Sequence, residues 1–266
     1  MIGCMESSPF ELANVDPKSP VAPSIEVWER LRPSQRRALA EALTFAPNEA
    51  LDAMAPDGTR HDDEVTETSD RLRHWFGGGG RQAFVAKNLR VFYPGEAAFD
   101  PDILVVLDVP HAHRDSWIVA DESGRGLDLV IEVLWKGKRN KDLVENVVRY
   151  ARLGIREYYV VDLRRGKLHV FRPTSPGAPY QVLEPVGGRI RSPLLDLDLV
   201  FDGRSLRFLH GISPVFSSRE AHGQLQVVLA ELSSELSEEK DRADREAARA
   251  ESEKERAESE KERAES

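Results

Sequence analysis

The chain has 266 residues and a formal net charge of −9, which is unevenly distributed. Residues 219–266 hold 15 acidic and 9 basic residues, whereas residues 1–218 hold 31 acidic and 28 basic residues and are nearly neutral. This balance excludes the global basic field of a non-specific nucleic-acid binder, so any nucleic-acid contact must use a local basic patch. The single cysteine, Cys4, excludes an internal disulfide and a cysteine-built zinc site.

The N-terminal region predicts little regular structure and no targeting segment. Residues 1–34 are rich in proline and serine and are expected to form an irregular leader. The N-terminus lacks the basic segment and apolar stretch of a signal peptide, and no apolar run approaches the roughly 18 residues of a membrane span. These absences favour a soluble cytoplasmic protein.

The expected globular domain, residues 35–215, opens with two helices and a strand. The helices are predicted over residues 33–47 and 61–76. The four glycines at residues 77–80 predict a turn, because each glycine costs a helix about 1 kcal/mol relative to alanine. Alternation of apolar and polar residues then predicts a strand over residues 83–93.

Two acidic residues lie at the edges of two apolar runs in the middle of the chain. Asp102 precedes residues 103–107, and Glu132 interrupts residues 127–134, which predict a strand buried on both faces. An ionised carboxylate in such a strand is costly unless it is paired or binds a metal. The alternative is ordinary structure, with Glu132 in an ion pair with the basic loop at residues 135–139 and Asp102 as a turn residue after proline.

The next segment predicts a strand, a crossover helix and a parallel strand. Residues 140–153 place their apolar side chains on one face, with Asn140 or its neighbour as the cap and Gly154 closing the helix. Residues 157–162 form the second strand of this right-handed unit. A tight turn at residues 165–166 then predicts a hairpin with the following strand.

The C-terminal region, residues 219–266, predicts a charged helix with a heptad repeat. Its leucine seam, residues 225–236, has the 4, 3, 4 spacing of a coiled coil: Leu225, Leu229, Leu232 and Leu236. In the same phase, the seam positions beyond it are alanine and glutamate, which bury little, so the distal part favours a solvated single helix. Only the leucine seam could dimerise, and a purely solubilising helix is the alternative.

The series of motifs from Asp102 onward resembles the PD-(D/E)xK restriction-endonuclease-like superfamily, specifically the bacterial Uma-type group of restriction endonucleases. The matching residues are 101–102, 130–134, 141–143 and 150–162, and looser similarity extends over residues 35–212. The resemblance implies an α/β fold, a mixed β-sheet flanked by helices, with Asp102 and Glu132 on neighbouring strands. It also implies Mg²⁺, or Mn²⁺ in its place, held by Asp102, Glu132 and the backbone carbonyl of Val133 for hydrolysis of a phosphodiester.

The sequence departs from this pattern at the lysine. Leu134 stands two residues after Glu132, where the superfamily motif has lysine, and Asn146 stands where Uma-type members carry a substitute lysine on the next helix. The remaining candidates are in the basic loop and the first helical turn: Lys136, Lys138 and Lys141. Each of them could instead be a solvated residue that contacts DNA phosphate. His61 and Glu64, one helical turn apart, could face the site or be ordinary surface residues.

These observations leave three hypotheses for the function. The first is a metal-dependent endonuclease acting on DNA, with Asp102, Glu132, Lys141 and Lys136 as catalytic candidates. The second is a nuclease fold without catalysis that binds DNA or protein, because the pattern lysines are absent. The third is a scaffold that acts through its tail. A homodimer could form through the domain or through the leucine seam.

Overall fold

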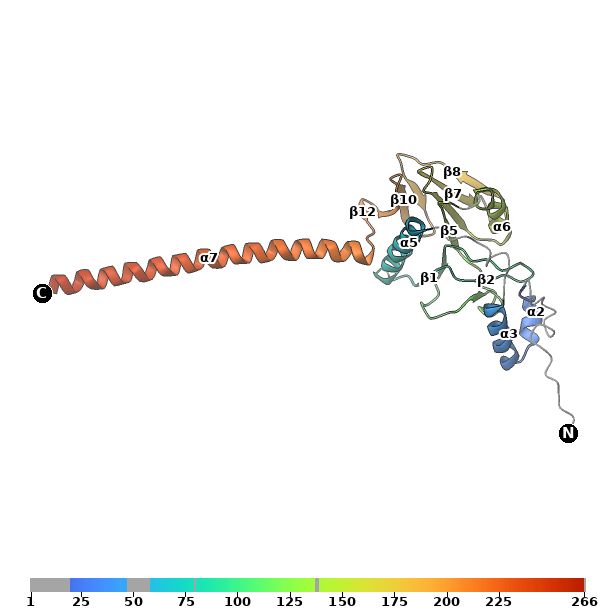
Figure 1. The fold of residues 1–266 in the computed structure, drawn as a ribbon, viewed down its shortest axis with the longest axis horizontal. Coiled ribbons are helices and arrows are strands. Elements are labelled where there is room, and N and C mark those ends of the chain that lie inside the picture. The colour runs from blue at the N-terminus through green and yellow to red at the C-terminus, as the bar shows by residue number, and fades with distance from the viewer. Residues whose placement is uncertain (1–19, 47–57, 79, 137–138, 266) are drawn as a thin grey trace, which may run out of the picture. The chain divides into compact units, whose positions relative to one another are not determined.

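The structure is a computed structural model that describes residues 20–46, 58–78, 80–136 and 139–265 (Figure 1). The chain divides into two compact units, residues 1–217 and residues 218–266. Within the described ranges, no helix combines the length and apolar character that a membrane crossing requires. The first part of the expected leader, residues 1–19, lies outside the described residues.

A six-stranded mixed sheet forms the centre of the first unit. Its spatial order is β1, β3, β5, β6, β7, β8, and all neighbours are antiparallel except β5 and β6, which are parallel. The strands span Ala83–Lys87 (β1), Ile103–Leu107 (β3), Leu129–Leu134 (β5), Glu157–Asp162 (β6), Lys167–Pro173 (β7) and Tyr180–Leu183 (β8). Every residue of β3, β5 and β6 is buried, which confirms the prediction that β5 is covered on both faces.

The connection from β5 to β6 is the predicted helical crossover. It consists of a wide turn, η1 (Lys141–Glu145), followed directly by α6 (Asn146–Arg152). Gly154 follows with a φ of +76°, a left-handed conformation that ends a helix at little steric cost for glycine. Asn140 does not cap the helix, because its backbone is already helical, and its amide donates to Glu145 Oε1 at 2.8 Å.

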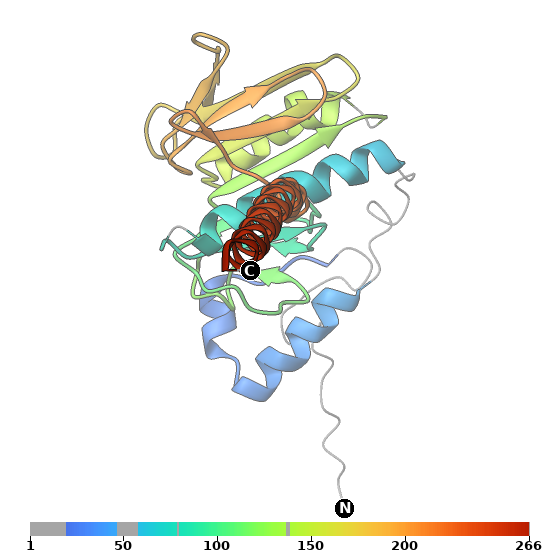
Figure 2. The same cartoon turned by 90° about the vertical axis from the view of Figure 1, so that its left-hand side faces the viewer.

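Helices cover both faces of this sheet (Figure 2). The long helix α5 (Thr59–Gly78) packs Val65 and Leu72 against the odd-numbered residues of β5, whereas Tyr150 of α6 packs on the opposite face. The predicted turn at residues 77–80 begins later than expected, because Gly77 and Gly78 still belong to α5.

A four-stranded antiparallel sheet packs into the same core as α5. Its order is β12, β11, β10, β9, and its strands span Ile190–Ser192 (β9), Leu197–Phe201 (β10), Leu206–His210 (β11) and Ser213–Pro214 (β12). Two buried polar residues of α5 hold β11. Glu64 Oε1 accepts the Leu206 N–H at 2.7 Å, and Arg71 Nη1 donates to the Leu206 carbonyl at 3.3 Å. Helix α5 is therefore fixed to both sheets.

Two short helices and a two-stranded parallel sheet lie at the end of the first unit remote from the four-stranded sheet (Figures 1 and 2). They are α2 (Ile25–Arg30), α3 (Pro33–Phe45), β2 (Val91–Phe92) and β4 (Trp117–Ile118). Helix α2 falls within the stretch predicted to be irregular, where Ser24 Oγ accepts the Val27 N–H and caps it. The strand predicted over residues 83–93 is broken at Asn88, whose φ of +52° is left-handed.

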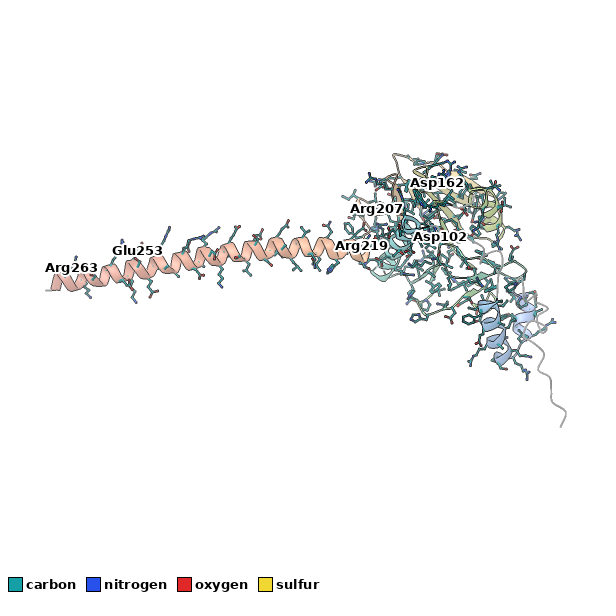
Figure 3. The ribbon with its side chains drawn as sticks, viewed as in Figure 1. Asp102, Asp162, Arg207, Arg219, Glu253 and Arg263 are labelled. Atoms are coloured by element: carbon teal, nitrogen blue, oxygen red, sulfur yellow. The ribbon has the colours of Figure 1, made fainter. Side chains whose placement is uncertain are left out.

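The second unit is the single helix α7 (Ser218–Glu265), 48 residues long. From His222 onward every described side chain is exposed, and Figure 3 shows Glu253 and Arg263 projecting from the helix. The predicted charged C-terminal helix is thus confirmed as a helix.

Candidate functional site

Asp102 lies immediately before β3, at the end of the strands where β5 continues past β3. The ladder between β3 and β5 ends at the pair formed by Ile103 and Ile131. Beyond it, the Val133 N–H donates to Asp102 Oδ2 at 2.7 Å instead of to a strand. The side chain of Asp102 remains 19% exposed. The fold therefore fixes this carboxylate and leaves it within reach of a ligand.

Glu132 occupies the middle of β5 and is only 5% exposed. The Tyr150 hydroxyl donates to Glu132 Oε1 at 2.8 Å, and the Asp102 N–H donates to Glu132 Oε2 at 3.3 Å. The structure therefore brings together the two carboxylates that were singled out in the sequence. The two residues are in direct contact, because the backbone N–H of Asp102 donates a hydrogen bond to the side chain of Glu132.

The charge on Glu132 is electrostatically unfavourable in this surrounding. Burial raises the pKa of Glu132 well above its ordinary value, and the charges of Asp102 and Asp142 raise it further. The charge of Lys141 and the hydrogen bond from Tyr150 lower the same pKa. Burial also raises the pKa of the Tyr150 hydroxyl, which stays protonated and donates. A cation bound beside Glu132 would therefore stabilise its ionised form.

The oxygen atoms of Asp102, Glu132 and the Val133 carbonyl are of the kind that a small, hard cation such as Mg²⁺ prefers, together with water oxygens. The N–H and carbonyl of one strand residue point to the same side, so the Val133 carbonyl faces the side on which its N–H meets Asp102. In the described ranges, no group of three or more His, Cys, Asp and Glu residues is arranged to hold a metal. A cation would thus need both carboxylates, the carbonyl and water.

The lysine candidates occupy different places. Lys141 begins η1 and is partly buried, and its positive charge acts on Glu132. Lys136 is exposed, and its Nζ lies close to Gly58, the residue just before α5. Lys138 lies outside the described residues. Of the two lysines described, Lys141 is the one whose charge acts on the carboxylate.

The two positions where the family pattern places lysine are buried and structural. Leu134 is 4% exposed and belongs to the apolar core on the α6 face. Asn146 is also 4% exposed, and its Nδ2 donates to Asp142 Oδ1 at 3.2 Å. An uncharged amide therefore takes the place of a cation beside Asp142.

His61 is the residue that the sequence could not place. Its Nε2 lies 3.1 Å from Asp102 Oδ2, and its side chain is 12% exposed. Glu64, considered together with it, turns away and bonds to Thr68 and the Leu206 N–H. The alternative ion pair of Glu132 with the basic loop is not formed among the described residues, where Arg139 lies 3.6 Å from Asp162 instead.

The fold is restriction-endonuclease-like with an added C-terminal helix. It has the mixed sheet, the helical crossover between the parallel strands β5 and β6, and the two carboxylates where β3 begins beside β5. Residues 33–205 match the family described as "Uma2: Putative restriction endonuclease". The chain therefore belongs to the Uma2 family, which confirms the resemblance noted in its motifs. Helix α7 lies outside the matched residues.

One similar solved structure is a crystal structure described as a putative nuclease belonging to DUF820 from Anabaena variabilis. It is 17% identical, the alignment covers 53% of this chain and 76% of that chain, and the TM-score is 0.42. No curated protein matches the chain.

Proposed function

We propose that the protein is a Mg²⁺-dependent endonuclease that hydrolyses phosphodiester bonds of DNA in the cytoplasm. The observation that carries this proposal is the hydrogen bond from the Asp102 N–H to the Glu132 carboxylate, where β3 begins beside β5. An acidic side chain that is 5% exposed and lies beside two further carboxylates has no ordinary structural advantage. As a ligand of a bound cation, the same side chain would have its charge neutralised.

The residues of the site have separate tasks in this proposal. Two groups, the Val133 N–H and His61 Nε2, contact Asp102 Oδ2 and fix the carboxylate, which would be one of the groups that hold the metal. Tyr150 fixes Glu132 in the same way. When bound, Mg²⁺ supplies neutralisation of charge on the phosphate and an acidified water.

We assign Lys141 to the reacting phosphate. Lys141 lies at the start of η1, and its positive charge lowers the pKa of Glu132, so a phosphate bound beside Glu132 would also be close to this charge. Lys136 is assigned to the DNA backbone, together with Arg60, whose guanidinium lies 4.8 Å from the centre of the Trp135 ring. These residues form the local basic patch that a nearly neutral domain needs in order to bind DNA.

Cleavage of supercoiled plasmid tests the proposal, with Mg²⁺, Mn²⁺ or EDTA, for the wild type and for Glu132→Gln. Asp108→Asn is the matched control, since Asp108 follows β3 at the end opposite to Asp102 and is 57% exposed. We expect metal-dependent nicking by the wild type and the control and none by Glu132→Gln. Equal nicking by Glu132→Gln would contradict the assigned site.

The second candidate function is a nuclease fold that binds DNA or protein without cleaving it. The buried amide of Asn146, in the place of the family's lysine, is the observation that favours it. Folded wild-type protein that binds DNA and leaves it intact with either metal would support this function over the first.

A further inference from the structure

Helix α7 carries an apolar face that nothing within its own unit covers. Six large apolar side chains lie exposed within twelve residues of the helix: Leu225, Val227, Val228, Leu229, Leu232 and Leu236. Their exposed fractions range from 48% to 69%. Exposure of this kind on an isolated helix marks a contact surface, because apolar side chains gain free energy when water is removed from them.

The spacing of the leucines identifies the kind of partner. A helix that packs on a globular surface presents a broad apolar stripe with a period near 3.6 residues. In the leucine seam, Leu225 and Leu232 are seven residues apart, as are Leu229 and Leu236, which is the heptad repeat with a period of 3.5 residues. The positions that flank the seam are mostly polar, Gln226, Ser233 and Glu235, with Val228 as the one apolar residue. A narrow seam with this period fits another helix that winds around it.

The charges beside the seam fit a second copy of the same chain in parallel orientation. With Leu229 and Leu236 at heptad position a, Glu235 occupies position g and Lys240 occupies position e of the next heptad. In a parallel, in-register pair, Glu235 of each chain faces Lys240 of the other, so two attractive pairs form. An antiparallel pair with the same leucine layers would place Val228 near Glu235 and form neither of them.

The seam ends where the charge pattern changes. From residue 239 on, glutamate and arginine alternate at spacings of three and four along one helix face: Glu239, Arg242, Glu246, Arg249, Glu253, Arg256, Glu260 and Arg263. Such pairs stabilise a single helix by about 0.2–0.5 kcal/mol each. In a parallel pair, every one of these glutamates would face its own copy at seam position d. The distal half therefore supports itself and adds nothing to the pairing.

We infer that residues 225–240 of α7 pair in parallel with a second copy of this chain, and that the helix beyond them remains single. The seam spans only two heptads, so the association is weak and depends on concentration. The inference is independent of the nuclease proposal, because mass is measured without DNA or metal.

Sedimentation equilibrium of the full chain tests the inference, between about 1 and 100 µM, where a short seam is expected to associate. Val227 and Leu232 are both 56% exposed, but only Leu232 lies in the seam. We expect Leu232→Glu to raise the dissociation constant by about 100-fold or more, as a buried unpaired charge does, and Val227→Glu to leave it unchanged. Circular dichroism verifies that both variants keep α7.

The orientation is tested by exchanging charges. Glu235→Lys and Lys240→Glu should each weaken the association, and the double variant should restore it. Residues 235 and 240 are five positions apart and do not face each other on one helix, so rescue requires a partner chain. A full chain that stays at 29.9 kDa throughout, or equal effects of Leu232→Glu and Val227→Glu, would overturn the pairing. A missing rescue would overturn the parallel register.

Discussion

Replacing Glu132 by glutamine should stabilise the protein at neutral pH in the absence of metal, although it removes the proposed activity. Glutamine keeps the size of the side chain and one acceptor oxygen. It removes a charge that is buried close to Asp102 and Asp142. The ionised carboxylate of Glu132 therefore lowers the free energy of unfolding relative to a neutral residue at the same position.

The magnitude follows from the contacts of this side chain. At an effective dielectric constant of about 20, two like unit charges repel each other by about 4 kcal/mol at about 4 Å and by about 2 kcal/mol at about 8 Å, so about 3 kcal/mol is the order of the repulsion between Glu132 and its neighbouring carboxylates. Against this gain, the single oxygen of glutamine can accept from Tyr150 or from the Asp102 N–H but not from both, because these donors use different oxygens of Glu132, and the lost hydrogen bond costs about 1–2 kcal/mol. The net gain is about 1–2 kcal/mol, or roughly 2–8 °C in Tm for a unit of this size.

The gain should depend on pH. The folded-state pKa of Glu132 is raised above its ordinary value of 4.5, so its protonated form contributes full stability below that pH. This contribution is lost as the pH rises through the folded-state pKa. Glutamine does not titrate, so the difference in Tm should be near zero or reversed at about pH 4 and should grow toward about pH 8.

Tryptophan fluorescence during heating in EDTA measures this difference in the first unit, because all four tryptophans lie in it. The exposed Asp108→Asn variant is the control: Arg81 lowers the pKa of Asp108, so the stability lost in this variant should be larger at about pH 8 than at about pH 4, the opposite of the dependence expected for Glu132→Gln. A Glu132→Gln variant that is no more stable than the wild type at about pH 8, or equally more stable at both pH values, would refute the reasoning.

Three further predictions concern the groups around the carboxylates. Lys141→Ala should lower kcat for plasmid cleavage about 100-fold, whereas Lys136→Ala should mainly raise KM; equal kcat values for both would contradict their assigned roles. Adding Asn146→Lys to Lys141→Ala should restore part of the lost kcat, because it returns a cation beside the site, and a double variant no faster than Lys141→Ala would count against this. His61→Ala should weaken Mn²⁺ binding measured by calorimetry about tenfold or more, whereas His61→Gln, which keeps a donor for Asp102, should weaken it less; equal affinities would remove His61 from the site.

Local pattern was sufficient to predict most of the central sheet. Residues 127–134 are apolar at nearly every position, and the strand found there is fully buried. The crossover helix and the hairpin after residue 162 follow from equally local signals. The break at Asn88 was not predicted, because its cause lies elsewhere in the chain: the Asn88 N–H donates to the Asp102 carbonyl at 3.1 Å.

The candidate site shows the same division between local and distant signals. Glu132 was recognisable because a charged residue in an apolar strand is costly wherever the strand lies. The contact between His61 and Asp102 joins residues 41 positions apart, and no local pattern reports it. Glu64 could be taken for a surface residue of a polar helix, yet it is buried because its partner, the Leu206 N–H, is 142 positions away.

The hydrogen bond from the Leu206 N–H to Glu64 also bears on where the chain can be shortened without disturbing the candidate site. The family match ends at residue 205, one residue before this bond, and every site residue named above precedes that point. A fragment cut there would keep all its chemical groups and lose β11, which holds the helix that carries His61. A shortened chain should therefore extend through His210, the end of β11, because this strand holds the helix that positions His61 although it contributes no atom to the candidate site.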